Sequence, residues 1–563
     1  MKLSFSTDYG SPEHWDRLVA FAHQYGAARL VYWCDPNLNA VNPPLLHRKY
    51  PGLVRDEDQP GVLRYQERMR QAAAKTVAAG MEFWYVFQVL EVPKRTDLQA
   101  LFPGWFNAQG EPDMNSEIVY QLIRDQLQEL LEVEPRLSGI ELWVMEGAAF
   151  KVADLKYQTL SLEEICMRIV DTVWEVVSRA GRRMSVDLHT AAGNAETLAG
   201  LFQAATRHPE IIISGDNVIG DFSLCLPFNA HLQRAAATNP VTVHFDVNGE
   251  YWGRNFVPTS ALSQYAAHIE EARRLGVEYA DGRVATIHNQ WSPYANVLPS
   301  RRKCYPALAQ VRDDLPLPRD LEIPAFDTLG GFNAEFFSQR VHDPKVEPEA
   351  VLRQFLVREF GPGAEALVPT FMGLEATLSK LFNMDKNYFV AQSCHQPPWL
   401  VIFWALDAHL TAEPGTPIPP PEAMQRPGHK AAFKGWPTPV GHRAAGTPAL
   451  VWEKVEALAE AEAMLAEVKA LSGSLKPEDR AFIVKQFEDL VFIARGYRWV
   501  LEAQAHYYLL QLGQRRGDLP NAERLAVCLH ELEQTAQEWE ARYPAGRYHL
   551  GEMLRLWLKT IKG

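Results

Sequence analysis

The chain has 563 residues, of which 47% are hydrophobic and 22% are charged, and its formal net charge is −13. A chain of this length buries a large core and is expected to divide into two or more domains. The acidic balance, without a long basic block, argues against a nucleic-acid partner, and no apolar run is long enough to predict a membrane span. The amino-terminal segment "MKLSFSTDYG" lacks the apolar core of a secretory signal, so we expect a cytoplasmic protein.

The first 300 residues alternate short β-rich runs with amphipathic helical patterns. The predicted strands are "LSFS", "RLVYW", "MEFWYVF", "GIELWVM", "RMSVDLH", "IIIS", "VTVHFDV" and "RVATIH". Ser116 and Ser161 are placed to cap two of the intervening helices. This alternation predicts a parallel sheet, and about eight units in this length favour a (β/α)8 TIM barrel over residues 1–325. A doubly wound sheet is the alternative.

From about residue 330 the pattern becomes helical throughout. The stretches 348–361, 450–471, 477–510 and 521–543 all have a helical period, which predicts an α-helical carboxy-terminal domain over residues 326–563. A Pro/Gly-rich insertion at 413–448 interrupts it. A loop of this length is interpreted as a lid, a dimer contact or a flexible connection.

Acidic side chains gather at the predicted strand ends, where barrel enzymes carry their catalytic groups. The polar residues at these ends are Glu146, Asp187, His189, Asp216, Asp221, His244, Asp246 and Glu250. One acid after a strand is more often a helix cap, but several at one barrel mouth repel one another unless they are protonated, bind metal or face a substrate. The pattern therefore predicts an active site. Trp84 and Trp291 lie near similar positions and are candidates for its wall.

Two chemistries need such a cluster. Glycoside hydrolysis uses a protonated acid and a second carboxylate, with no metal and no cofactor. A metal-dependent sugar isomerase or aldolase would instead gather ligands such as Glu146, Asp187 or His189, Asp216 and His244 around a divalent ion. The aromatic residues after Glu250 favour hydrolysis, because sugar rings stack on such side chains. A non-catalytic sugar-binding protein is a third reading.

Three short segments resemble the α-glucuronidases of glycoside hydrolase family 67. Glu146-Gly147 is similar to the family's acid loop, and "DNVIGDFSLCLPF" and "VHFDVNGEYWG" resemble the segments that carry two further carboxylates, here Asp221 and Glu250. Residues 330–361 resemble the entry to the family's helical domain. The resemblance spans residues 130–361 and implies a TIM barrel, a helical domain that mediates dimers and hence a homodimer.

The resemblance also implies roles for individual residues in an inverting hydrolase of oligosaccharides or small glycosides. Glu146 would be the general acid, and Asp221 and Glu250 would hold and deprotonate a water, with Asp221 favoured as the base. Tyr251 and Trp252 would form a wall of the sugar subsite. The expected hydroxyl-binding residues are Asp187, His189, Asp216 and Asp246.

Two departures from the family matter. The family places a further domain before its barrel, whereas here we expect the first barrel strand at the start of the sequence. Asp216 stands where the family has a lysine that grips the uronate carboxylate, and an aspartate would repel that group. We therefore keep a neutral or different sugar beside an α-glucuronide as the expected substrate.

Overall fold

The computed structural model describes most of the barrel and several long helices. The described residues are 1–8, 12–33, 45–90, 92, 97–144, 152–188, 195–218, 224, 227–247, 257–284, 297–305, 323–384, 387–388, 447–511 and 520–542. The statements below concern these residues.

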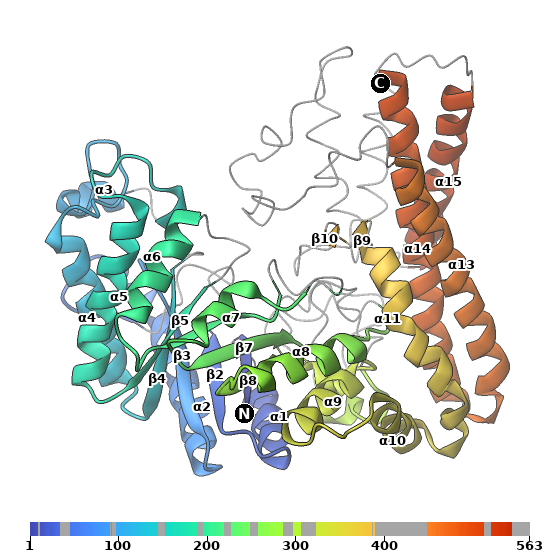
Figure 1. Cartoon of the computed structure of the whole chain (residues 1–563), viewed down its shortest axis with the longest axis horizontal. Helices are drawn as coiled ribbons and strands as arrows, with labels where there is room; N and C mark the ends of the chain where they lie inside the picture. The colour runs from blue at the N-terminus through green and yellow to red at the C-terminus, as the bar shows by residue number, and fades with distance from the viewer. Residues whose placement is uncertain are drawn as a thin grey trace.

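Eight parallel strands close into a barrel, in which each strand pairs with the next and β8 pairs with β1 (Figure 1). The strands are β1 (Lys2–Asp8), β2 (Arg29–Trp33), β3 (Glu82–Gln88), β4 (Leu137–Trp143), β5 (Arg183–Asp187), β6 (Ile212–Asp216), β7 (Val241–Asp246) and β8 (Tyr279–Arg283). The (β/α)8 prediction is confirmed, and the doubly wound alternative is wrong because the sheet has no free edge.

Helices connect the strands and cover the outside of the barrel. They are α1 (Pro12–Gln24), α2 (Gln59–Ala78), α3 (Leu98–Leu101), α4 (Glu117–Val133), α5 (Leu162–Arg179), α6 (Ala195–Thr206), α7 (Ala230–Ala235) and α8 (Leu262–Arg274). The predicted caps are confirmed. The Ser116 side chain accepts a hydrogen bond from the backbone N–H of Ile118, and Ser161 forms a reciprocal capping box with Glu164.

The eighth strand lies earlier in the chain than the sequence predicted. "RVATIH" begins at Arg283, but the strand is Tyr279–Arg283, with the sequence "YADGR". Asp281 in its centre faces the barrel interior, where it contacts Ser4 and His244. Because Asp281 and Arg283 are charged, this strand lacks the apolar run from which the other strands were predicted.

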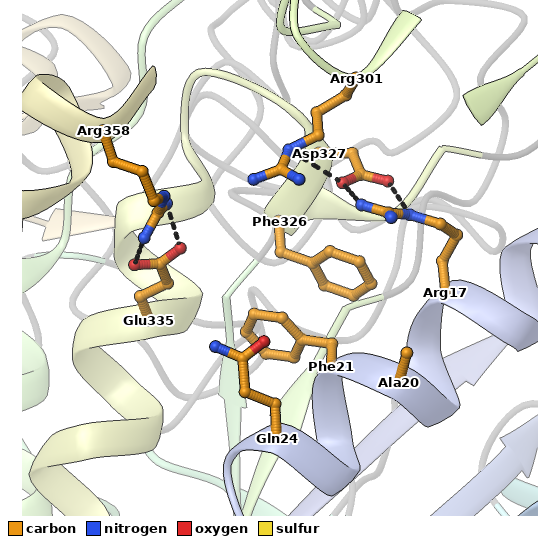
Figure 2. A pocket seen from close by; sticks show the side chains of 9 residues that line it. All are labelled: Arg17, Ala20, Phe21, Gln24, Arg301, Phe326, Asp327, Glu335 and Arg358. Atoms are coloured by element: carbon orange, nitrogen blue, oxygen red, sulfur yellow. Dashed lines mark hydrogen bonds and ion pairs between the residues drawn. The ribbon is translucent and has the colours of Figure 1, made fainter. Parts of the chain in front are cut away.

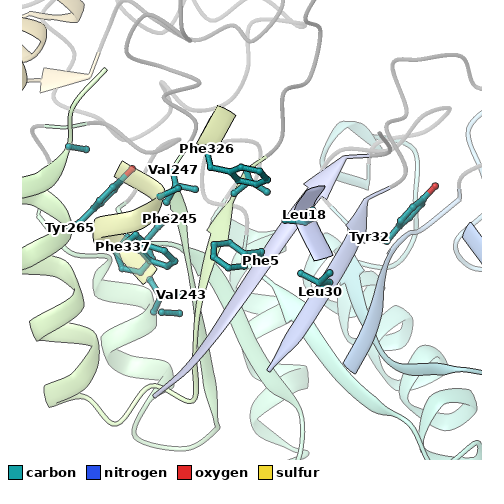
Figure 3. Packing of buried hydrophobic residues seen from close by; sticks show 14 of the residues in the cluster. Phe5, Leu18, Leu30, Tyr32, Val243, Phe245, Val247, Tyr265, Phe326 and Phe337 are labelled. Carbon is teal, nitrogen blue, oxygen red and sulfur yellow. The ribbon is translucent and has the colours of Figure 1, made fainter. Parts of the chain in front are cut away.

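The outer face of the sheet packs an apolar layer against the helices, and α9 (Gly331–His342) takes part in it. Phe337 of α9 contacts Phe5 and Phe245, with ring centroids 6.3 and 5.1 Å apart, and Figure 3 shows these three rings in the same apolar layer. A side chain at Gly282 would collide with Phe337, so β8 and α9 meet closely. Because α9 follows β8 and packs on the barrel, it is the barrel's last helix, although the sequence analysis ended the barrel at residue 325.

Large side chains fill the amino-terminal end of the barrel interior. The Arg29 guanidinium lies 4.7 Å from the Trp84 ring and 4.0 Å from the Tyr279 ring. A Cβ atom at Gly139 would come within 2.5 Å of the Trp84 ring, so glycine is required for Trp84 to fit. This end of the barrel is a packed plug, and the chemistry must lie toward the other end.

The rest of the described chain is almost entirely helical, as predicted. It comprises α10 (Pro348–Phe360), α11 (Val368–Phe382), the two-residue strands β9 (Asn383–Met384) and β10 (Asn387–Tyr388), α13 (Thr447–Leu471), α14 (Pro477–Gln511) and α15 (Pro520–Arg542). In Figure 1 the rods α13, α14 and α15 stand side by side to the right of the barrel. None of the described helices combines the length and apolarity that crossing a membrane requires. The insertion at 413–448 lies outside the described residues.

Candidate active site

Three of the predicted sugar-binding carboxylates lie where their strands end. Asp187, Asp216 and Asp246 are the last residues of β5, β6 and β7, and each is at most 5% exposed. Side chains alternate along a strand, so Asp216 and Asp246 share the inward face with Ser214 and His244. The carboxyl end of the barrel, which we call the mouth, is therefore acidic, as the sequence predicted.

Aromatic and basic side chains complete the described part of the mouth. Trp33 at the end of β2 and Trp143 at the end of β4 meet edge to face, with ring centroids 4.5 Å apart. The Arg283 guanidinium, at the end of β8, lies 4.7 Å from the Trp33 ring. Trp84, predicted as a pocket wall, lies instead in the plug at the opposite end, where it is fully buried. The aromatic surface near the described mouth thus comes from Trp33 and Trp143.

Below the mouth, four ionisable side chains from four strands form what we call the histidine–carboxylate cluster: Glu141, Asp187, His244 and Asp281. The His244 Nε2 atom lies 3.4 Å from Glu141 Oε1 and 3.2 Å from Asp187 Oδ2. On the other side of the ring, Nδ1 lies 3.2 Å from Asp281 Oδ2. All four residues are at most 4% exposed. The barrel thus concentrates three carboxylates around one imidazole away from solvent.

Charge in this cluster is strongly coupled. Burial alone would lower the pKa of His244, but the Glu141 carboxylate and the hydrogen bonds to Asp187 and Asp281 raise it well above its ordinary value. Burial raises the pKa of Asp187. Burial also disfavours the charged form of Asp281, but its contacts with His244 and Arg29 bring its pKa below the ordinary value. The Nε2 side of the ring thus faces two carboxyl groups, Glu141 and Asp187, and the Nδ1 side faces one, Asp281.

The sequence analysis missed Glu141 and Asp281 as site residues. Both lie inside strands, whereas the predicted site residues lie at strand ends. Glu141 alternates with Gly139 and Trp143, so a period of two through "GIELW" places it on the inward face. That alternation was the available signal. The meeting of Glu141 with Asp187 and His244 depends on barrel closure and register.

The remaining predicted site residues lie outside the described residues: Glu146, His189, Asp221, Glu250, Tyr251, Trp252 and Trp291. Their places in the chain are nevertheless informative. Glu146 follows β4, Asp221 follows β6 and Glu250 follows β7, each by only a few residues. Those three strands run parallel and end at the same mouth.

A cavity of about 220 Å³ lies on the outside of the barrel between α1 and α9 (Figure 2). Its floor is the stacked pair Phe21 and Phe326, with ring centroids 4.3 Å apart. Its charged walls are ion pairs, in which Arg17 binds Asp327 and Arg358 binds Glu335. Because these charges already compensate one another, the cavity is read as a structural joint rather than as the reaction site.

Comparison with known proteins supports the fold. No protein-family model matches the chain, and no curated protein is similar to it in sequence. A GH138 enzyme targeting pectin rhamnogalacturonan II shares the fold over the whole chain and 83% of its own length, with a TM-score of 0.63 and 9% identity.

Two other solved structures are more distant. An O-GlcNAc hydrolase of Thermobaculum terrenum matches the whole chain and 93% of its own length, at a TM-score of 0.41 and 10% identity. A D-allulose 3-epimerase from Methylomonas sp. matches 60% of this chain and 98% of its own, at a TM-score of 0.31 and 12% identity. The likeness to the GH138 enzyme shows a TIM-barrel fold like that of a glycoside hydrolase, and glycoside hydrolase family 67 is not specifically supported.

Proposed function

We propose that the chain is a glycoside hydrolase that binds its sugar at the mouth of the barrel. The observation that carries the proposal is the common direction of β4, β6 and β7. These strands end at one acidic mouth, and the carboxylates that the sequence selects, Glu146, Asp221 and Glu250, follow them in the chain by a few residues, which supports a shared site. The likeness of the whole chain to a pectin-targeting GH138 enzyme agrees with a carbohydrate substrate.

The proposed mechanism inverts the anomeric centre. Glu146 donates a proton to the leaving oxygen, and Asp221, assisted by Glu250, takes a proton from the attacking water. Inversion requires the acid and base carboxyl groups to lie about 6.5–9.5 Å apart, so that the water fits between the base and the sugar. Asp216 and Asp246 are suited to accept hydrogen bonds from vicinal hydroxyl groups.

The substrate class is tested with a panel of aryl glycosides that contrasts uronic acids with neutral sugars. Under the α-glucuronidase reading, uronides are hydrolysed faster. If Asp216 repels a sugar carboxylate, neutral glycosides are hydrolysed faster and uronides bind poorly. Proton NMR of the first sugar released reports whether the anomeric configuration is inverted.

The acid assignment is tested with Glu146→Gln, which keeps the side-chain shape and removes the proton donor. We expect a loss of about 10²–10⁴-fold in kcat on substrates with poor leaving groups and a much smaller loss on activated aryl glycosides. Glu132→Gln is the matched control, because Glu132 is exposed in the last turn of α4, which leads into the amino-terminal end of β4, away from the mouth. Equal small losses on both substrate types would contradict the assignment.

A non-catalytic sugar-binding protein makes a different prediction for the same panel. Calorimetry would then detect saturable oligosaccharide binding, while no sugar would be released from any glycoside. That result would overturn the hydrolase proposal while leaving the mouth as a carbohydrate site.

A further inference from the structure

We propose that Glu141, Asp187 and His244 bind one divalent transition-metal ion inside the barrel, below the mouth. One atom from each of these side chains, a carboxylate oxygen or a ring nitrogen, lies within 4.8 Å of the other two. A metal about 2.1 Å from each donor holds neighbouring donors about 3.0–3.4 Å apart. The separations of His244 Nε2 from Asp187 and Glu141, 3.2 and 3.4 Å, already match that spacing.

The donors stand on rigid elements. Glu141 comes from β4, Asp187 from β5 and His244 from β7, so the barrel itself fixes their positions. A site built on strands holds its geometry better than one built on loops. The three donors therefore need little rearrangement to accept an ion.

The burial of Glu141 is a second observation, independent of the donor spacing, that points to a bound ion. Its side chain is fully buried, and neither carboxylate oxygen accepts a hydrogen bond from any described residue. Buried polar atoms almost always have a hydrogen-bond partner, so a buried carboxylate without one, 3.4 Å from the His244 ring nitrogen, requires an explanation. Its oxygens converge with those of Asp187 on the Nε2 face of His244, which is where an ion would complete them.

Asp281 orients the ring for this role. Its carboxylate lies 3.2 Å from His244 Nδ1, so it can accept the Nδ1–H proton and leave the Nε2 lone pair facing Glu141 and Asp187. Three electron-rich groups facing one another repel unless a proton or a metal cation lies between them, and a bound metal would take the place of the proton. A carboxylate behind a metal-binding histidine is a recurrent arrangement that fixes the ring and strengthens the ligand.

Charge balance favours a divalent ion. Asp281 accepts a hydrogen bond from Ser4, which in turn accepts one from the buried Arg29 guanidinium at 2.8 Å, so its charge has a cation nearby. Glu141 and Asp187 both face the Nε2 atom of His244, so a doubly charged ion would neutralise the two carboxylates while His244 binds it as the neutral ring. One imidazole with two carboxylates suits Zn²⁺ or Mn²⁺.

The test is metal binding by the full-length protein, with no turnover required. The protein is stripped with chelator and dialysed against Mn²⁺, Zn²⁺ or Co²⁺ at about 100 μM, a hundredfold above a Kd of about 1 μM. Elemental analysis should find one equivalent of metal per chain. Co²⁺ should give a visible absorption band that reports coordination by nitrogen and oxygen ligands. The proposal is independent of hydrolysis, because neither readout depends on a sugar.

Three variants locate the ion. Glu141→Gln should abolish binding of the stoichiometric metal and the Co²⁺ band. Asp281→Asn should weaken affinity about 10–100-fold while retaining the band, because the residue positions a ligand without being one. Glu134→Gln is the control, since Glu134 is equally buried but pairs with Arg136.

Two results would overturn the proposal. One is a folded wild-type protein, by circular dichroism, that takes up far less than one equivalent of all three metals. This measurement uses the wild-type protein, so it tests the proposal even if a variant fails to fold. The other is a folded Glu141→Gln protein that binds metal as tightly as wild type, since the ion would then lie elsewhere.

Discussion

Asp327 connects α1 with the segment that follows β8. A substitution at Asp327 therefore tests how much these contacts contribute to stability. Asp327 is fully buried and accepts hydrogen bonds from two side chains, Arg17 of α1 and Tyr305. The Arg301 guanidinium lies 3.9 Å from it. Asp327→Asn keeps the shape, retains one acceptor oxygen and removes the negative charge that two arginines face.

The expected cost follows from these contacts. Removing one member of a fully buried ion pair costs about 3–5 kcal/mol, because the other charge is left buried without a partner. The Arg17 side chain is 28% exposed and Arg301 is 32% exposed, so both regain part of their hydration in the variant. Tyr305 can still donate to the amide oxygen. We therefore expect the free energy of unfolding to fall by about 2–3 kcal/mol.

The assay is urea unfolding at neutral pH, followed by circular dichroism. At a slope of about 3 kcal/mol per molar urea, the midpoint should fall by about 0.7–1 M. Asp16→Asn is the matched control on the same helix, because Asp16 pairs with Lys75 but its side chain is 59% exposed. Such a surface pair contributes about 0–1 kcal/mol. Equal midpoints for the two variants would refute the reasoning that burial gives the Asp327 pair its value.

Two further outcomes follow from the same packing. Phe337→Ala should lower the free energy of unfolding by about 3–5 kcal/mol in a urea titration, because it empties the contact of α9 with the barrel; a cost under about 1 kcal/mol would mean that α9 does not belong to the barrel core. The second outcome concerns the pH dependence of Glu359. Burial would raise its pKa, but Ser300 and Arg358 hold it below the ordinary value. The stability lost in Glu359→Gln should thus be full at pH 7 and shrink as the pH falls through that lowered pKa; a loss unchanged down to pH 3 would contradict it.

Much of the fold could be predicted because local signals agreed with one another. Strand-length apolar runs alternate with amphipathic helices, and caps such as Ser161 mark where helices begin. The strand signal failed at β8, where Asp281 and Arg283 replace the apolar residues of a buried strand. The packing of residues 331–342 on the barrel could not be predicted either, because a helical period does not reveal whether a helix packs on a sheet or on other helices.

The candidate site also contains residues whose positions could be predicted from the sequence and contacts that could not. Asp187, Asp216 and Asp246 could be predicted because parallel strands end at one mouth, so position in the chain suffices to place them. The contact of Glu141 with His244 could not be predicted, because it joins β4 and β7, which are not adjacent strands of the barrel. It exists only because the barrel closes and turns both side chains inward.

The polar and charged side chains inside this barrel are not the ones that would give the most stable fold. Barrel interiors are usually filled by branched apolar side chains, whereas here small hydroxyl groups and charges occupy the middle. Ser185 bonds to Ser214 at 2.8 Å, and Arg29 bonds to Thr242 at 3.1 Å. Apolar side chains of similar size would avoid the cost of burying charge. A chain that keeps Glu141, Asp187, His244 and Asp281 together at this place therefore gives up stability, and such a loss is expected where the residues serve binding or chemistry.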